Sequence, residues 1–185
     1  MTMMTRAGVF ALAIGCALAL ATSTAGAGER KVTRGWEGAK GGSASITRSR
    51  GNGSASREVS RSGRNGGSVE KSATRGGGVR TKDVTRTGRN GGSVEKSVTR
   101  GGGTATRDVT RTSPSGKSLE RSSERVVDRD NRSVTKSSGT TYPDGTTSSR
   151  TRTTTKNDDG SYTVEGERTN RAGETKTFSG TVTRE

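Results

Sequence analysis

An internal repeat of 25 residues constrains the fold of this chain more than any other feature. Arginine recurs at this interval, at Arg50, Arg75, Arg100, Arg125 and Arg150. The blocks 68–78 and 93–103 differ only where one has Ala73 and the other has Val98. Self-similarity at a fixed period indicates that one supersecondary unit has been copied and that each copy packs against its neighbours. The sequence therefore predicts a repeat architecture.

Each unit contains two segments rich in Thr, Val and Ser, separated by glycine-rich joints. The joints at 63–67 and 88–92 both read GRNGG, and 113–117 occupies the same place in the next unit. Asn-Gly and repeated glycines supply the positive φ angles of tight turns. The segments between them are rich in β-branched residues and show no 3.6-residue period, which favours strands over helices. We therefore expect each unit to be an antiparallel hairpin.

Side chains alternate in character along each expected strand. In 80–87, cations and valine occupy the even positions, whereas threonine and aspartate occupy the odd positions. Because successive strand side chains point to opposite faces, one face should carry Val, Arg and Lys and the other Thr, Ser and carboxylates. A hairpin turning at 88–92 would place Val84 opposite Lys96 and Arg80 opposite Arg100. The latter is a like-charge pair that costs energy unless an anion bridges it.

Apolar residues are too few for a conventional core. After Ala27, Leu, Ile, Val and Phe make up only 16 of 158 residues, about a tenth, which is well below the level of globular domains. We predict an all-β fold, a repetitive antiparallel β-hairpin meander in a single layer. It should be marginally stable in isolation, with partial disorder as the open alternative. The expected organisation is a signal peptide at 1–27, a flexible leader at 28–45, hairpin repeats at 46–138 and a Thr-rich strand region at 139–185.

The N-terminal residues have the pattern of an export signal. Arg6 precedes the apolar run 7–20, and Ala25-Gly26-Ala27 is a small-residue cleavage site. We expect cleavage near Ala27 and a periplasmic or extracellular location, in a bacterium. An N-terminal membrane anchor and a lipoprotein modified at Cys16 are the alternatives.

Removal of this signal would leave few groups for catalysis. Cys16 is the only cysteine and the chain has no histidine, so the usual thiol nucleophile, general base and metal ligands are missing. The segment 113–118 ends like a phosphate-binding loop, and 128–131 and 157–160 are similar to parts of calcium loops. Each lacks the full motif, so we expect turns. We predict no enzyme activity, no cofactor, no metal site and no small-molecule substrate.

The strongest functional indication is charge. The chain carries +15, and +14 once Arg6 leaves with the signal. Exported basic chains attract polyanions such as extracellular DNA, lipopolysaccharide or acidic polysaccharide. The predicted polyanion-binding residues are the repeated cations Arg50, Arg57, Arg61, Lys71, Arg75, Arg80, Lys82, Arg86, Lys96, Arg100, Arg107, Arg111, Arg121, Arg125, Arg150 and Arg152. The alternatives are a structural fibre, spacer or surface scaffold that self-associates through its strands, and a basic surface that only maintains solubility.

Overall fold

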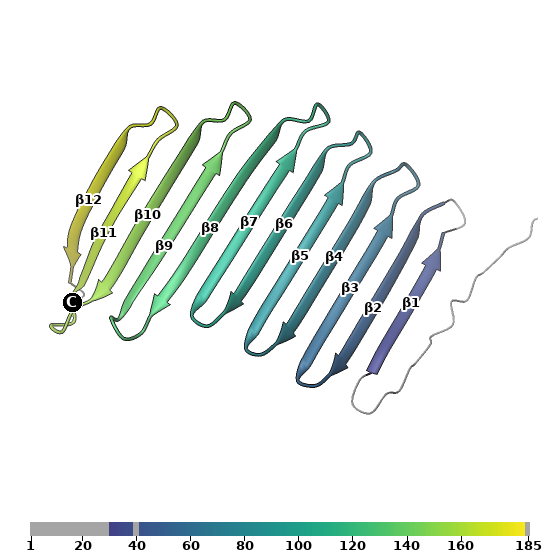
Figure 1. The fold of residues 1–185 in the computed structure, drawn as a ribbon, viewed down its shortest axis with the longest axis horizontal. Helices are drawn as coiled ribbons and strands as arrows, with labels where there is room; N and C mark the ends of the chain where they lie inside the picture. Colours follow the sequence, from purple (N-terminus) through teal and green to yellow (C-terminus); the bar gives the residue numbers. More distant parts are fainter. Residues whose placement is uncertain (1–29, 39–40, 184–185) are drawn as a thin grey trace, which may run out of the picture.

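The computed structural model describes residues 30–38 and 41–183, which form one open antiparallel sheet of twelve strands (Figure 1). The strands are β1 (Arg30–Glu37), β2 (Ser43–Gly51), β3 (Ser54–Ser62), β4 (Ser68–Gly76), β5 (Val79–Thr87), β6 (Ser93–Gly101), β7 (Thr104–Thr112), β8 (Ser118–Asp128), β9 (Ser133–Thr141), β10 (Thr147–Lys156), β11 (Tyr162–Thr169) and β12 (Thr175–Val182). Each strand pairs with the next one along the chain, from β1 to β12. The all-β meander predicted from the repeat is confirmed.

The predicted register is also confirmed at the hairpin that turns at 88–92. Val84 lies opposite Lys96, and Arg80 lies opposite Arg100. The turn closes with a hydrogen bond of 2.7 Å from the Gly88 amide to the Gly92 carbonyl. Gly91 has a φ of 82°, in the left-handed region that glycine adopts without strain. The same arrangement recurs at 63–67 and 113–117.

The N-terminal part of the sheet differs from the prediction. We expected no clear strand in 28–45, but β1 occupies Arg30–Glu37 and pairs with β2 along its whole length. The expectation of a flexible leader is therefore wrong for the described residues of this segment. Gly35 and the lone Trp36 obscured an alternation that places Arg30, Val32, Arg34 and Trp36 on one face. The predicted signal peptide and cleavage site lie outside the described residues.

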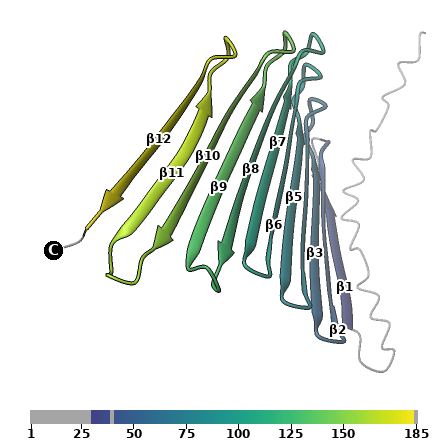
Figure 2. The ribbon, with the colours of Figure 1, turned by 60° about the vertical axis from the view of Figure 1, so that its left-hand side comes forward.

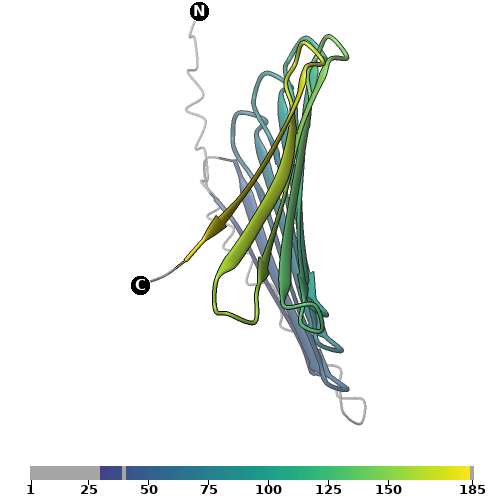
Figure 3. The same ribbon diagram turned by 90° about the vertical axis from the view of Figure 1, so that its left-hand side faces the viewer.

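The sheet has a single layer (Figures 2 and 3) and almost no buried side chains among the described residues. Among the described residues, only Ala44, Val59 and Ser161 are buried. Backbone contacts occur only between strands that are consecutive in the meander. The backbone ladder and the pairs of side chains across it therefore provide the stabilising contacts that a core provides elsewhere. No helix capable of crossing a membrane is present in residues 30–38 and 41–183.

Candidate functional site

The register sorts the charged side chains of the strands onto opposite faces of the sheet. We call the face that carries Val84 and Lys96 the basic face, and the face that carries Thr85 and Glu95 the hydroxyl face. Because directly paired residues share a face, these assignments extend from β1 to β12 without interruption. Every Lys and Arg of the twelve strands except Lys31 lies on the basic face. Every Asp and Glu of the strands lies on the hydroxyl face.

All the predicted polyanion-binding residues lie on the basic face. β2 carries Arg50, β3 carries Arg57 and Arg61, β4 carries Lys71 and Arg75, β5 carries Arg80, Lys82 and Arg86, β6 carries Lys96 and Arg100, β7 carries Arg107 and Arg111, β8 carries Arg121 and Arg125, and β10 carries Arg150 and Arg152. The structure thus brings together residues spread over about 100 positions of the chain.

The basic face also contains cations that the sequence analysis did not assign to it as site residues. These are Arg30, Arg34, Arg48, Lys136, Lys156, Arg168 and Lys176. Arg48 and Lys136 follow the same two-residue alternation as the predicted set, so that pattern could have found them. The two on β1 were missed because no strand was expected there.

Like charges lie side by side where the cations of neighbouring strands are paired. Arg80 is paired with Arg75 of β4 on one side and with Arg100 of β6 on the other. We call these three residues the arginine ridge. It runs across the strands, and adjacent strands are about 4.8 Å apart. After Ala105, the same row continues with a second group of paired cations, Arg125, Lys136 and Arg152.

The carboxylates of the chain do not compensate these cations. The ion pairs within the described residues are two, Arg132 with Asp158 at 3.0 Å and Arg171 with Asp144, and both join turns. On the hydroxyl face, Asp83 accepts hydrogen bonds from the hydroxyls of Ser72 at 3.1 Å and Ser97 at 2.7 Å. Except for Lys31, the strand cations therefore lie on the opposite side of the sheet from the strand carboxylates.

Three carboxylates in or directly beside the turns accept hydrogen bonds from residues close to them in space. Hydrogen bonds from Thr146 and Arg171 lower the pKa of Asp144 to about 2. Hydrogen bonds from the Asn131 side chain and backbone lower the pKa of Asp128, and those from Ser161 lower the pKa of Asp159. The segment 128–131 is the end of β8 and the turn that follows it, and 157–160 is a turn, as predicted. The segment 113–117 is a hairpin turn in which the Ser113 hydroxyl accepts a hydrogen bond from the Lys117 amide at 3.1 Å.

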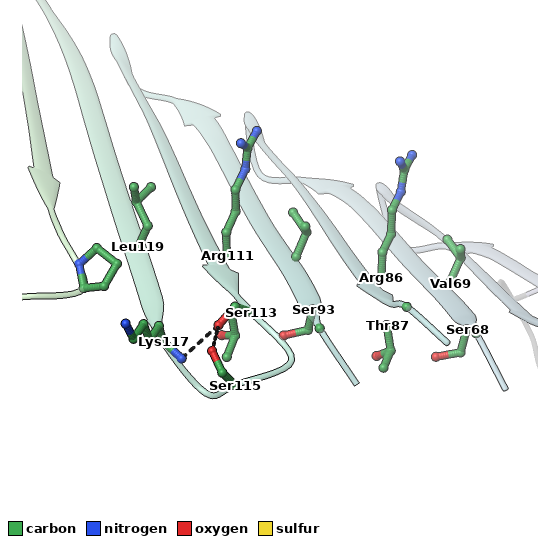
Figure 4. A pocket seen from close by; sticks show the side chains of 16 residues that line it. Ser68, Val69, Arg86, Thr87, Ser93, Arg111, Ser113, Ser115, Lys117 and Leu119 are labelled. Carbon is green, nitrogen blue, oxygen red and sulfur yellow. Dashed lines mark hydrogen bonds between the residues drawn. The ribbon is translucent and has the colours of Figure 1, made fainter. Parts of the chain in front are cut away.

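The basic face carries open depressions. Between β6 and β10, an open depression is lined by the side chains of Lys96, Arg100, Arg107, Arg125, Lys136, Arg150 and Arg152. At one end of the strands, a second hollow has Arg86 and Arg111 beside Val69 and Leu119. Figure 4 shows these four side chains extending to one side of the sheet, whereas Ser68 and Thr87 extend to the other. The face thus presents guanidinium groups separated by short apolar side chains.

Comparison of the chain with protein-family models, with curated proteins and with solved structures gives no match.

Proposed function

We propose that this protein binds extended polyanions on its basic face, as an exported, non-enzymatic repeat protein of the periplasm or extracellular matrix. The observation that carries the proposal is the segregation of the strand charges. Lys and Arg side chains of neighbouring strands are directly paired on the basic face, as in the arginine ridge, whereas the strand carboxylates lie on the hydroxyl face. Paired like charges cost energy, and a bound anion that bridges them would relieve this cost.

The geometry favours a long ligand over a compact one. Each 25-residue unit adds further cations to the same face, so binding should be multivalent along the sheet. The rows of cations run across the strands, which favours a chain of anionic groups lying in that direction. DNA, lipopolysaccharide and acidic polysaccharide all carry such repeated anionic groups.

The proposal is tested by comparing two triple variants that lose the same charge at different places. The first replaces the arginine ridge, Arg75→Gln, Arg80→Gln and Arg100→Gln. The matched control replaces three exposed cations off the basic face, Lys31→Gln on the hydroxyl face with Arg64→Gln and Arg89→Gln in turns. Binding to double-stranded DNA, lipopolysaccharide and alginate is measured between about 50 and 200 mM NaCl, a range over which affinity that depends on phosphate contacts falls steeply.

We expect the ridge variant to bind more weakly. For DNA, the slope of log K against log salt should become shallower by up to about 2.7, because each lost phosphate contact removes about 0.9. The control should keep the slope of the unmodified protein. Equal losses in the two variants would mean that net charge alone attracts the ligand. No binding of any of the three polyanions at low salt would refute the proposal.

A further inference from the structure

The two outer strands of the sheet have free edges within the part of the chain that the structure describes. β1 pairs only with β2, and β12 pairs only with β11. They lie at opposite ends of the sheet (Figure 1). Each has eight residues, and neither contains proline. An exposed edge of this kind is a template for another strand.

The direction of the two edges allows one copy of the chain to continue another. Strand directions alternate along a meander, so with twelve strands β12 runs antiparallel to β1. A second copy in the same orientation would therefore place its β1 antiparallel to β12 of the first. This junction would repeat the connection between any two neighbouring strands of the sheet, with the covalent turn missing.

The backbone donors of the two edges are also in phase. The Gly38 amide donates to the Gly42 carbonyl at 2.8 Å, and the Asn170 amide donates to the Glu174 carbonyl at 2.9 Å. Hydrogen-bonded pairs alternate along an antiparallel ladder. Continuing that alternation, the odd-numbered residues of both β1 and β12 direct their amides to the free edge. Pairing Thr175 with Glu37 and Val182 with Arg30 matches odd residues with odd residues, and even with even, along all eight positions.

Pairing an edge with itself does not achieve this match. A full-length antiparallel pairing of β1 with a second β1 would place Arg30 opposite Glu37. The Arg30 amide points toward β2, whereas the Glu37 amide points toward the free edge, so the two residues could not form a hydrogen-bonded pair. The same mismatch arises for β12, where Thr175 would meet Val182. Only the junction between β12 and β1 uses every residue of both strands with the correct phase.

The side chains agree with this register. On the basic face, Phe178 would lie opposite Arg34 and Lys176 opposite Trp36, the alternation of cation and apolar side chain seen inside the sheet at Val84 and Lys96. On the hydroxyl face, Lys31 would meet Thr181. No like charges would be directly opposed. The junction would also cover Trp36 and Val182, whose exposed fractions are 47% and 54%.

We propose that a second copy of this chain adds its β1 to β12, in the register that pairs Arg30 with Val182, so that the protein assembles head to tail. The contact is heterologous, so an assembly of any length retains one free β1 and one free β12, and growth produces an open filament. The sheet twist (Figure 3) makes each junction a rotation as well as a translation. Polyanion binding is not required for this contact.

Edge-blocking variants test the proposal in protein expressed from the full-length gene. Thr33→Pro removes an outward amide of β1, and Thr177→Pro removes one of β12. Neither substitution removes an amide that donates to the adjacent strand, β2 or β11, and proline is tolerated at such edge positions. Thr33→Val and Thr177→Val keep the amides and serve as matched controls, with circular dichroism to confirm that strand content is retained. Molecular mass is measured by sedimentation as protein concentration and salt increase, without polyanion.

We expect the unmodified protein and the valine variants to form species of increasing mass, more so at higher salt because their repulsive positive charges are screened. Each proline variant alone should remain monomeric, since every contact needs one β1 and one β12. An equimolar mixture of the two should stop at a dimer, because each supplies the edge that the other has lost. Dimerisation of either variant alone would overturn the proposal, as would a monomeric unmodified protein. Polyanion binding weakens as salt increases, whereas assembly through β1 and β12 should increase. A failure of the polyanion proposal can therefore be distinguished from a failure of this one.

Discussion

At the scale of residues, a sheet without a core depends on individual contacts across its surface. Phe178 of β12 lies opposite Gly166 of β11. Its ring extends over the glycine and lies 5.8 Å from the guanidinium carbon of Arg150 on β10. An aromatic side chain over a cross-strand glycine fills the surface that the glycine leaves open and excludes water from its backbone. This contact joins the last three strands on the basic face.

A small side chain at position 166 should disrupt this contact. In Gly166→Ala, the added Cβ would lie 2.6 Å from the Thr151 carbonyl oxygen and would also collide with the Phe178 ring. Since backbone cannot yield easily, we expect the free energy of local opening of β11 and β12 to fall by about 1–3 kcal/mol, the usual range for overpacking. Amide hydrogen exchange of these two strands measures this change.

Gly180→Ala on β12 is the matched control, because nothing lies within 4 Å of an added Cβ there. It should leave exchange unchanged or slow it, since alanine has less backbone freedom to lose than glycine. Equal effects at positions 166 and 180 would mean that the Phe178 contact has no energetic role.

At the scale of elements, the repeat contains most of the information that specifies the hairpin. The joints at 88–92 and the two-residue alternation were sufficient to predict the pairing of Val84 with Lys96 from the sequence. Register follows because a slip of one residue would exchange the two faces. β1 was not predicted, because Lys31 departs from the alternation and Gly35 and the lone Trp36 obscure it. The joint GAKGG at 38–42 lies 25 residues before GRNGG at 63–67 and closes with the same hydrogen bonds, so the repeat period could have indicated this strand. The arginine ridge, in which Arg80 lies between Arg75 and Arg100, became evident only when three strands were placed together.

Deleting one whole unit should shorten the sheet without changing its faces. Removal of residues 82–106 joins Thr81 to Arg107 and produces a strand that reads VRTRDVTRT, nearly identical to β5. Lys82, Arg86, Lys96 and Arg100 are lost from the basic face. We expect retained strand content by circular dichroism and a salt slope for DNA binding that is shallower by up to about 3.6. In the control, the same four cations are replaced by glutamine in the full-length protein, and the salt slope should equal that of the deletion variant. A slope unchanged in both variants would mean that these four cations do not contact the DNA.

At the scale of the whole molecule, stability should depend on position in the sheet. Backbone contacts occur only between consecutive strands, as in other quasi-one-dimensional repeat proteins. An inner strand has two neighbours, whereas β1 and β12 have one each within the described residues. β4 and β6 have the same sequence except at Ala73 and Val98. A difference in stability between these two strands would therefore reflect mainly their different positions in the sheet.

Amide hydrogen exchange at low protein concentration and low salt should therefore show protection that is greatest in β5–β7 and declines toward both ends. Opening from an end costs one interface at a time, whereas opening in the middle costs two. If copies join head to tail at higher salt, protection of β1 and β12 should rise while that of the central strands changes little, and the Thr33→Pro and Thr177→Pro variants should lose this rise. Simultaneous exchange of all twelve strands would instead mean that the sheet opens as one cooperative unit, which contacts restricted to neighbouring strands do not explain.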